Sequence, residues 1–524
     1  MFINEPPNDF AIADNRASFQ KALDRLDDEI KQQKYYACPI IDGNEIKVAQ
    51  EIKSVDPSHP DTTIGTVYLA QADQATKALT ALEDGCSTWR ATTPKKRAQI
   101  ICNVAALMRQ RRLALASLIV REAGKPWGEA DADVIEAIDF CEYYAEQSLQ
   151  LGVATKTADI PGEDNHYLYR PRGKALVIAP WNFPLAILCG MSVAALVTGN
   201  TAILKPSQQT SIIAFQFAKI LLEAGIPPNA LAFLPGYGSK IGAQLVEHPD
   251  IDLICFTGSL PVGLNILQKA AVVHPEQRGI KKVITELGGK NAIIIDEDAD
   301  LDAAIKGVLY SAFGYAGQKC SACSRVIVVG NIYEPFVERL CSAASDLIVG
   351  EAQDSSVFFG PLIDKTSQTK VLKSIAVAEQ ECTLAFRGQA PSSGYFVPPV
   401  IFRDVEPEAA LWREELFAPV LACCKAKSFT KAIELANDSQ YALTGGLFSR
   451  SPGNIDLARN SLEVGNLYIN RGCTGAIVGR QPFGGFRMSG IGSKAGGPDY
   501  LLQFMEPRTI TENTMRKGFA PDLA

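Results

Sequence analysis

Short apolar runs alternate with helix-like stretches between residues 174 and 285. The runs are rich in β-branched and aliphatic residues, and the apolar positions between them recur with helical spacing. They occupy residues 174–179, 201–204, 231–234, 253–256 and 283–285. Such alternation predicts a doubly wound, mostly parallel sheet with helices on its faces.

The chain on either side of this region also shows regular patterns. Strand-like runs at 292–295, 326–329 and 420–424 alternate with helices and predict a second α/β domain. Residues 1–50 form a polar arm with a helical stretch, and amphipathic helices are expected at 92–121 and 130–150. A short run with alternating aromatic residues, 167–170, predicts a hairpin strand that projects from the body.

Length and charge limit the class of protein. The chain has 524 residues, which is too long for a single core, and 47% of them are hydrophobic. Its net charge is −7 and it lacks a long basic block, which argues against nucleic acid or an anionic membrane as partner. The apolar stretch at 185–197 is too short to span a bilayer, and the N-terminal residues lack a signal pattern. A cytoplasmic protein is therefore expected.

The sequence offers few residues for a metal site or for a Ser-His-Asp triad. The 13 cysteines show no framework spacing, and Cys320 and Cys323 form a CxxC without a second pair. Only 4 histidines occur, none of them at i, i+4 from another. No metal site is predicted, and a nucleophilic cysteine would need a partner other than histidine.

Polar and glycine residues stand where the predicted parallel strands end. Ligands of such sheets bind at the carboxyl ends of the strands. In chain order these residues are Asn182, Lys205, Gly236 with Gly238, Gly258 with Ser259, and Glu286. Each of these residue types suits phosphate, sugar or reaction chemistry, although the usual GxGxxG fingerprint is missing.

One cysteine stands between a predicted helix, 301–313, and a predicted strand. A thiol on a tight turn can be partly exposed near backbone N–H groups, which favours the thiolate, so Cys320 is a candidate nucleophile. Glu286 at a strand end is suited to act as general base towards water. Asn182, between two prolines, can be aimed as an oxyanion donor. Taken singly, each of these residues also fits an ordinary structural role.

Seven motifs occur together in a fixed order across most of the chain. They are Pro180-Trp-Asn-Phe-Pro184, Lys205-Pro206, Phe256-Thr-Gly-Ser259, Glu286-Leu-Gly-Gly-Lys290, Gly317-Gln-Lys-Cys320, Glu414-Glu-Leu-Phe417 and Pro482-Phe-Gly-Gly485. This set resembles the aldehyde dehydrogenase superfamily. The segments around Cys320, Asn470 and Ser493 are most similar to its 1-pyrroline-5-carboxylate (L-glutamate γ-semialdehyde) dehydrogenases.

The resemblance implies an α/β fold with three parts. A Rossmann-type NAD-binding domain with the N-terminal arm is expected at 1–150 and 171–285, and an α/β catalytic domain at 286–482. A small β oligomerisation flap is expected at 151–170 and 499–513. The flap implies a homodimer or a dimer-based oligomer.

The resemblance also implies a reaction, the oxidation of glutamate γ-semialdehyde to glutamate through a cysteine thioester in proline catabolism. Cys320, Glu286 and Asn182 carry the chemistry. The residues that it implies for cofactor binding are Lys205, Ser207, Gly258, Ser259, Trp181, Glu415, Phe417 and Gly236. Those that it implies for the substrate are Ser321, Gly475 and Ala476 at the α-carboxylate, Phe183 and Phe483 around the aliphatic part, and Glu136 at the amino group.

Two positions depart from the pattern of the family. Gln208 stands where many relatives carry a glutamate that binds ribose, so NADP use is expected beside NAD. Ala418 replaces the usual glycine after Phe417. Alternatives are oxidation of another aldehyde such as succinic semialdehyde, the C-terminal module of a bifunctional proline-utilisation enzyme, a cofactor-free thiol hydrolase, and a silent binding protein.

Overall fold

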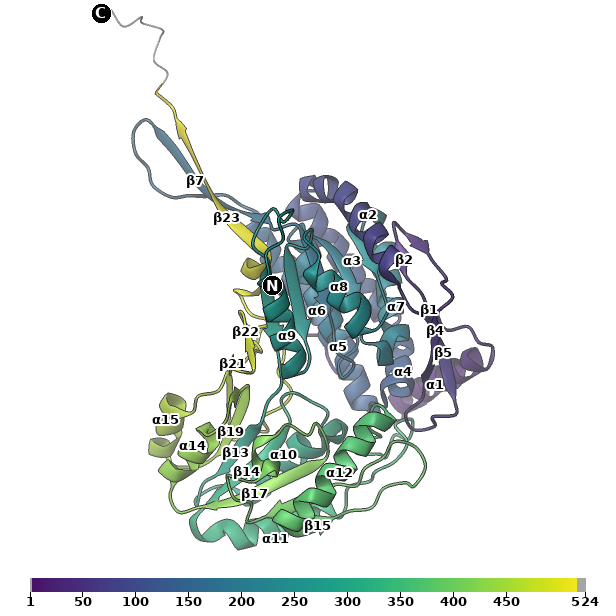
Figure 1. Ribbon diagram of the computed structural model, residues 1–524. Helices are drawn as coiled ribbons and strands as arrows, with labels where there is room; N and C mark the ends of the chain where they lie inside the picture. The colour runs from purple at the N-terminus through teal and green to yellow at the C-terminus, as the bar shows by residue number, and fades with distance from the viewer. Residues whose placement is uncertain (1, 516–524) are drawn as a thin grey trace, which may run out of the picture.

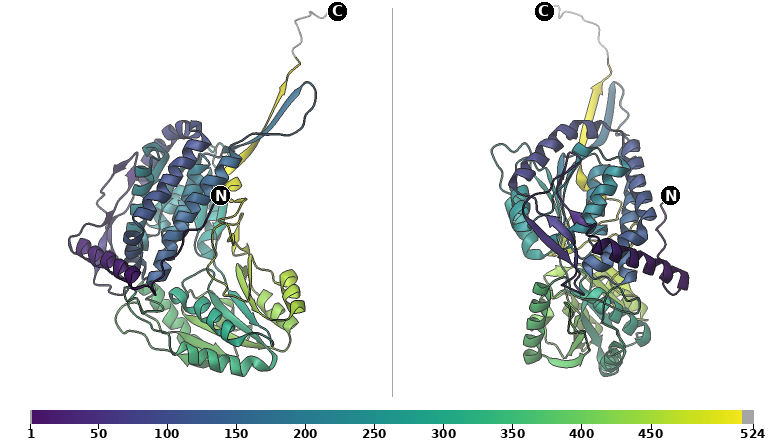
Figure 2. Two further views of the ribbon diagram at one scale, coloured as in Figure 1. Left: turned by 180° about the vertical axis from the view of Figure 1, so that it is seen from behind. Right: turned by 90° about the vertical axis from the view of Figure 1, so that its right-hand side faces the viewer.

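Two large sheets organise the chain. The computed structural model describes residues 2–515, which fold into two α/β lobes and a projecting β ribbon (Figure 1). Within these residues, eight strands form the first sheet and seven form the second. The ribbon leaves the first lobe and points away from the second in all three views (Figures 1 and 2).

The first sheet has the strand order β22-β12-β11-β8-β9-β10-β2-β3. Its parallel core consists of β8 (Lys174–Ile178), β9 (Thr201–Lys205), β10 (Leu231–Phe233), β11 (Leu253–Thr257) and β12 (Lys282–Glu286). The chain proceeds from β8 through β9 to β10 and then returns to the other side of β8 through β11 and β12. The order therefore reverses between β8 and β11, and the predicted doubly wound sheet is confirmed.

Helices cover both faces of this sheet. Side chains that alternate along β8 and β9 pack in turn against α3, α5, α6 and α7 on one face and against α2, α8 and α9 on the other. The helices are α2 (Ala72–Ala91), α3 (Pro94–Gln110), α4 (Arg112–Ala123), α5 (Trp127–Leu151), α6 (Ala186–Val197), α7 (Ser211–Ala224), α8 (Ala243–Glu247) and α9 (Leu260–Ala270). The single helix expected at 92–121 is wrong, because the chain turns at Arg111 between α3 and α4.

The second sheet has the order β15-β16-β17-β14-β13-β19-β20. Its strands are β13 (Asn291–Ile295), β14 (Cys323–Val329), β15 (Thr383–Arg387), β16 (Val400–Arg403), β17 (Val420–Ala426), β19 (Thr444–Phe448) and β20 (Asn466–Ile469). All neighbours pair in parallel except the edge strand β15. Its helices are α10 (Leu301–Phe313), α11 (Tyr333–Ala344), α12 (Lys365–Glu381), α13 (Ala410–Arg413), α14 (Phe429–Asn437) and α15 (Pro452–Ser461).

The ribbon joins distant parts of the chain. β7 (Glu163–Pro171) pairs antiparallel with β23 (Met505–Asn513) along its whole length and with the short β6 (Thr155–Lys156). The remaining elements are α1 (Ala13–Lys31), β1 (Tyr36–Ala37), β2 (Ile40–Ile41), β3 (Asn44–Glu45), β4 (Glu51–Val55), β5 (Thr63–Tyr68), β18 (Tyr441–Ala442), β21 (Phe486–Arg487) and β22 (Gly490–Ile491). Within residues 2–515, the helices are all too short or too polar to cross a membrane.

A four-residue crossing connects the two sheets. Glu286 is the last residue of β12 in the first sheet, and Asn291 begins β13 in the second. The glycines in between leave room for both lobes: a Cβ on Gly288 would lie 2.1 Å from the carboxylate of Glu415, and one on Gly289 would lie 2.6 Å from the Cys320 carbonyl oxygen. The crossing therefore brings residues of both lobes against each other at the strand ends.

Candidate active site

Cys320 stands on a sharp reversal of the backbone. α10 ends at Phe313, and Tyr315, Ala316 and Gly317 then adopt left-handed φ angles of 53°, 55° and 68°. Left-handed backbone costs ~1–2 kcal/mol for each residue other than glycine. The predicted turn between helix and strand is thus confirmed, and surrounding contacts must hold it in place.

Two side chains fix this turn, and sequence reasoning assigned neither of them a role. The Asn291 amide donates to the carbonyl oxygens of Cys320 at 2.7 Å and Ala322 at 2.9 Å. The Gln318 amide donates to Pro361 O at 3.1 Å and accepts from Ile363 N at 3.0 Å. The position of Asn291 directly after the Gly-Gly-Lys motif was the one available signal, but its partners lie far away in the sequence.

The thiol of Cys320 is partly exposed but sits among carboxylates. Burial raises its pKa well above the usual value, and Glu415 and Glu286 raise it further. The Ser321 backbone N–H opposes this shift. The expectation that the turn favours the thiolate is therefore wrong for this state, because negative neighbours and desolvation outweigh one N–H group.

Asn182 lies beside the same turn. Its side-chain amide is buried and donates to the Gln318 carbonyl oxygen at 3.0 Å, while its backbone oxygen accepts from the fully buried Lys125 at 2.9 Å. Lys125 also pairs with Asp133 at 2.9 Å. An amide nitrogen carries two N–H groups, so one remains for an oxyanion formed near Cys320.

Glu286 ends β12 and faces the cysteine from the other lobe. Burial raises the pKa of its carboxyl to about 8, and Lys494 opposes this shift. Its Oε2 is buried without a hydrogen-bond partner among the described residues. A carboxyl whose pKa lies near neutrality can take up a proton and release it again at working pH.

Lys205 and the start of α9 stand at the carboxyl ends of two parallel strands, β9 and β11. The Lys205 ammonium ends β9 in a buried position, where it donates to Pro206 O at 2.9 Å and its pKa falls to about 8 through desolvation. Ser259 is the N-cap of α9 but its side chain makes no capping bond, and the first turn carries no acidic residue. The N–H groups at this helix start, next to Gly258, are therefore suited to a pyrophosphate.

The other residues implied for the cofactor have defined contacts with their neighbours. The Trp181 and Phe417 rings meet edge to face at 5.6 Å, and Phe417 has a left-handed φ of 59°. Glu415 accepts from Gly289 N at 2.9 Å, and burial raises its pKa to about 7. Ser207 donates to Gln209 at 2.5 Å instead of facing open space. Gly236 packs against Ile241, where a Cβ would come within 2.8 Å of that side chain.

The residues implied for the substrate lie around the nucleophile turn. Ser321 is buried, and its carbonyl oxygen accepts hydrogen bonds from the Thr444 hydroxyl at 3.2 Å and from the Cys473 thiol at 3.4 Å. Cys473 is close in sequence to Gly475 and Ala476. Gly475 has a left-handed φ of 77° with open space at its Cβ position. A small loop of this kind can present backbone N–H groups to a carboxylate.

Aromatic and acidic side chains complete the surroundings. The Lys125 ammonium lies 3.7 Å from the centre of the Phe183 ring, and the backbone of Phe483 bridges to Ala495. Burial, with Asp133 as a negative neighbour, raises the pKa of Glu136 to about 8, and Glu136 in turn acts on Cys320. The structure thus brings Glu136, Glu286 and Glu415 together around one thiol.

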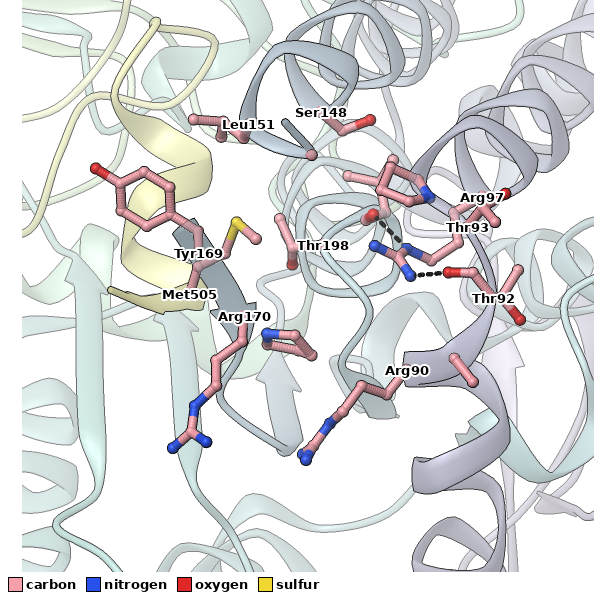
Figure 3. A pocket seen from close by; sticks show the side chains of 15 residues that line it. Arg90, Thr92, Thr93, Arg97, Ser148, Leu151, Tyr169, Arg170, Thr198 and Met505 are labelled. Carbon is pink, nitrogen blue, oxygen red and sulfur yellow. Dashed lines mark hydrogen bonds between the residues drawn. The ribbon is translucent and has the colours of Figure 1, made fainter. Parts of the chain in front are cut away.

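A separate cavity of about 340 Å³ lies at the foot of the ribbon (Figure 3). Its three arginines have structural partners: Arg97 donates to Val197 O at 2.9 Å at the end of α6, Arg170 pairs with Glu506 at 3.2 Å, and Arg90 lies 3.8 Å from the Cys86 sulfur. A cation at a helix C-terminus offsets the helix dipole. None of the predicted site residues lines this cavity. Within residues 2–515, no three His, Cys, Asp or Glu side chains are grouped so as to hold a metal ion.

Known proteins resemble this chain over nearly its whole length. Residues 45–510 match the sequence model of the aldehyde dehydrogenase family. A 1-pyrroline-5-carboxylate dehydrogenase of Geobacillus sp. (strain WCH70) is 46% identical over 510 residues, which cover 97% of this chain and 98% of that protein.

Solved structures extend this similarity. A 1-pyrroline-5-carboxylate dehydrogenase from Thermus with bound NAD has a TM-score of 0.95 at 42% identity, covering 98% of this chain and 99% of that one. Proline utilization A (PutA) from Bdellovibrio bacteriovorus has a TM-score of 0.97 at 47% identity over 99% of this chain. The match covers 54% of that longer chain. On these matches, the chain belongs to the aldehyde dehydrogenase family.

Proposed function

We propose that this chain oxidises L-glutamate γ-semialdehyde, the open form of 1-pyrroline-5-carboxylate, to L-glutamate with NAD as hydride acceptor. The observation that carries the proposal is the 46% identity, over 97% of the chain, to a relative of that name. The pairing of Cys320 with Glu286 across the two lobes supports it. The reaction is the second step of proline catabolism.

Cys320 begins the reaction. Its thiol loses its proton to solvent water, the sulfur forms a bond to the aldehyde carbon, and the second C=O electron pair moves onto the oxygen, which becomes an oxyanion. We assign the free N–H of Asn182 and the backbone N–H of Cys320 to stabilising this oxyanion. Bound at the site proposed below, NAD would supply the acceptor for the hydride of the same carbon.

Glu286 serves the second half of the reaction, which releases the acyl group from Cys320. It accepts a proton from water while the water oxygen bonds to the thioester carbon. The C–S bond then breaks and its electron pair returns to sulfur. Because the pKa of the Glu286 carboxyl is about 8, this side chain can take up and release the proton without an external base.

The binding roles in this proposal are those that the resemblance to the family implies. We assign Lys205 and Glu415 to the two riboses, the Gly258–Ser259 turn to the pyrophosphate, and Trp181 with Phe417 to the nicotinamide end. Ser207 and Gly236 complete this wall. A carboxylate held by the backbone of the Ser321 and Gly475–Ala476 segments avoids burying a fixed charge.

The remaining substrate contacts belong to the same proposal. Phe183 and Phe483 enclose the aliphatic carbons, and Glu136 faces the amino group. Gln208 carries no negative charge that would repel a 2′-phosphate, so we expect some NADP turnover beside the NAD reaction. We also place the reaction in the cytoplasm and assign the ribbon of β7 and β23 to a homodimer.

A substrate panel with both cofactors tests the function. We expect glutamate γ-semialdehyde to give a kcat/KM with NAD at least tenfold above that for succinic semialdehyde, which lacks the α-carboxylate. Cys320→Ala is the control and should lose NADH formation altogether. Equal efficiencies for the two aldehydes would reject the substrate assignment, and undetectable turnover with NADP would reject the expected NADP use.

An ester-cleavage assay distinguishes the proposed dehydrogenase from a cofactor-free thiol hydrolase. A hydrolase of that kind would cleave activated esters at a rate unaffected by NAD and would never produce NADH. Production of one NADH for each aldehyde consumed would exclude that alternative.

A further inference from the structure

Gly484 and Gly485, on a short loop, lie in space between the side chains of Glu286 and Lys494. Lys494 was not among the predicted site residues. The ammonium of Lys494 donates to the Gly484 carbonyl oxygen and lies 3.4 Å from Asn466 Oδ1. On the other side of the loop, the backbone N–H of Gly485 faces the Glu286 carboxylate and opposes the rise of its pKa. Gly484 itself allows this approach, because a Cβ there would lie 2.9 Å from Glu286 Oε1 and 3.5 Å from Lys494 Cα.

The two contacts belong to a single peptide unit. The carbonyl of Gly484 and the N–H of Gly485 are joined by one planar bond and point in opposite directions. A positive charge on the carbonyl oxygen polarises the unit and strengthens the N–H as a donor. Asn466 steadies the loop, because its Oδ1 accepts from Gly484 N at 3.3 Å and its Nδ2 donates to Pro482 O at 2.9 Å.

We propose that Lys494 is a positioning residue for Glu286, acting through the peptide unit between Gly484 and Gly485. The ammonium fixes the orientation of this peptide, and its N–H holds Glu286 as a carboxylate facing the thioester. This inference rests on the proposed function and adds a further residue to its second half.

Few charged groups other than Lys494 influence the ionisation of Glu286. The titratable groups of the described residues that act with Glu286 are Lys494, the Cys320 thiol of the nucleophile turn and Tyr500 of the 500–504 turn. The pKa values of Cys320 and Tyr500 are both raised, so both groups are neutral at working pH. Lys494 is thus the charged group among them that favours the ionised form of Glu286.

The step that depends on this arrangement is thioester hydrolysis. Water loses a proton to Glu286, its oxygen bonds to the acyl carbon, and the C–S bond breaks with its electron pair on Cys320. Without the ammonium, Glu286 holds its proton to a higher pH and hydrolysis slows. Hydride transfer, which precedes this step, does not need the base.

Lys494→Met and Lys494→Arg test the proposal in the full chain with NAD and glutamate γ-semialdehyde. Rapid mixing measures the first NADH burst, and acid quench measures decay of the acyl-enzyme from pH 6 to 10. We expect an unchanged burst for Lys494→Met, with acyl-enzyme decay slowed about tenfold at pH 7 and its pH midpoint raised by about one unit. Lys494→Arg, which keeps the charge, should recover most of this loss.

Each other outcome has a defined meaning. An unshifted pH midpoint in Lys494→Met would overturn the proposal, as would a burst slowed as much as the decay. Equal behaviour of the Met and Arg variants would also overturn it, since the charge would then be irrelevant. If the unmodified chain forms no NADH from this aldehyde, the proposed function fails first, and the inference fails with it.

Discussion

Cys320 and Glu286 face each other from different lobes, and both are shifted towards their protonated forms. For the thiol the causes are burial and the three carboxylates of Glu415, Glu286 and Glu136, and for the carboxyl the cause is burial. Each group is therefore poorly ionised before its partner molecules arrive. Bound substrate and cofactor would change both environments, which links ionisation of the nucleophile to assembly of the site.

Replacing the base tests its role in hydrolysis. In Glu286→Gln, the first NADH burst should persist, while steady-state turnover falls by about 100-fold or more, because the side chain can no longer accept a proton from water. In the unmodified chain the hydrolysis rate should rise with pH through about 8 and level off above it, since the carboxylate is the active form. Stopped-flow and steady-state assays across this range measure both. Steady-state turnover unchanged in the variant would remove Glu286 from the role.

Replacing a carboxylate next to the thiol tests the electrostatic argument. Glu415→Gln removes a negative charge that raises the pKa of Cys320. Alkylation by iodoacetamide at pH 8, without cofactor, should then become about three- to tenfold faster, because more thiolate is present. Glu414→Gln is the matched control, since this neighbouring glutamate is exposed and is not among the groups that shift the thiol. Equal rates in the two variants would contradict the argument.

At the element scale, the nucleophile depends on a turn that local propensity disfavours. Three successive left-handed residues are tolerated because Asn291, Gln318 and the packing of Ala418 against Gly317 hold the turn. The strain is thus balanced by contacts with β13, the residue stretch before β17 and the loop at 361–363.

Gly317→Ala tests this balance. A Cβ at this position would lie 2.3 Å from Ala418 O, at a φ of 68°. We expect the free energy of unfolding to fall by about 2 kcal/mol or more, with a larger relative loss of kcat. The matched control is Gly128→Ala in α5, whose Cβ would meet nothing within 4 Å. Denaturant unfolding and NADH assays measure both, and equal stabilities would show that the turn tolerates a side chain.

Helices and strands with strong hydrophobic patterns could be predicted from the sequence, and those with weak patterns could not. The parallel strands and α10 were predicted closely, because fully buried strands and a clear helical period leave strong patterns. α2 was missed, since its buried face mixes the small or polar residues Gln74, Ala75, Ala78 and Gly85 with only three large apolar side chains. A Cβ on Gly85 would lie 1.9 Å from Asn229 O. The break at Arg111 carries no glycine or proline to mark it.

The candidate site followed a different rule. The residue types at the strand ends could be predicted, because topology alone brings those ends together. Their partners could not: Lys125 meets Asn182 across 57 positions and Asn291 meets Thr444 across 153. The raised pKa of the thiol also depends on Glu415, which lies 95 positions further along the chain. Contacts of this range leave no local pattern.

At the scale of the molecule, the catalytic groups are divided between lobes that meet at the short crossing of residues 287–290. The base ends a strand of the first sheet, and the nucleophile precedes a strand of the second. Any rotation of one lobe against the other would change the gap between Cys320 and Glu286. A contact that restrains both lobes would therefore affect turnover as well as assembly.

The ribbon of β7 and β23 is suited to form such a contact with a second copy. It projects from the first lobe (Figure 2). β23 is an edge strand of the ribbon, and its Ile510 side chain is 41% exposed. Exposed edges of this kind pair readily with other chains, and a lysine on an edge blocks such pairing. We expect Ile510→Lys to shift the protein from dimer to monomer in sedimentation velocity at micromolar concentration, with kcat reduced. Thr511→Lys adds the same charge to the opposite face of the same strand, so it should retain the dimer if Ile510 faces the partner. A monomeric unmodified chain with full turnover would show that the two lobes keep their geometry without a partner, and that the ribbon serves another purpose.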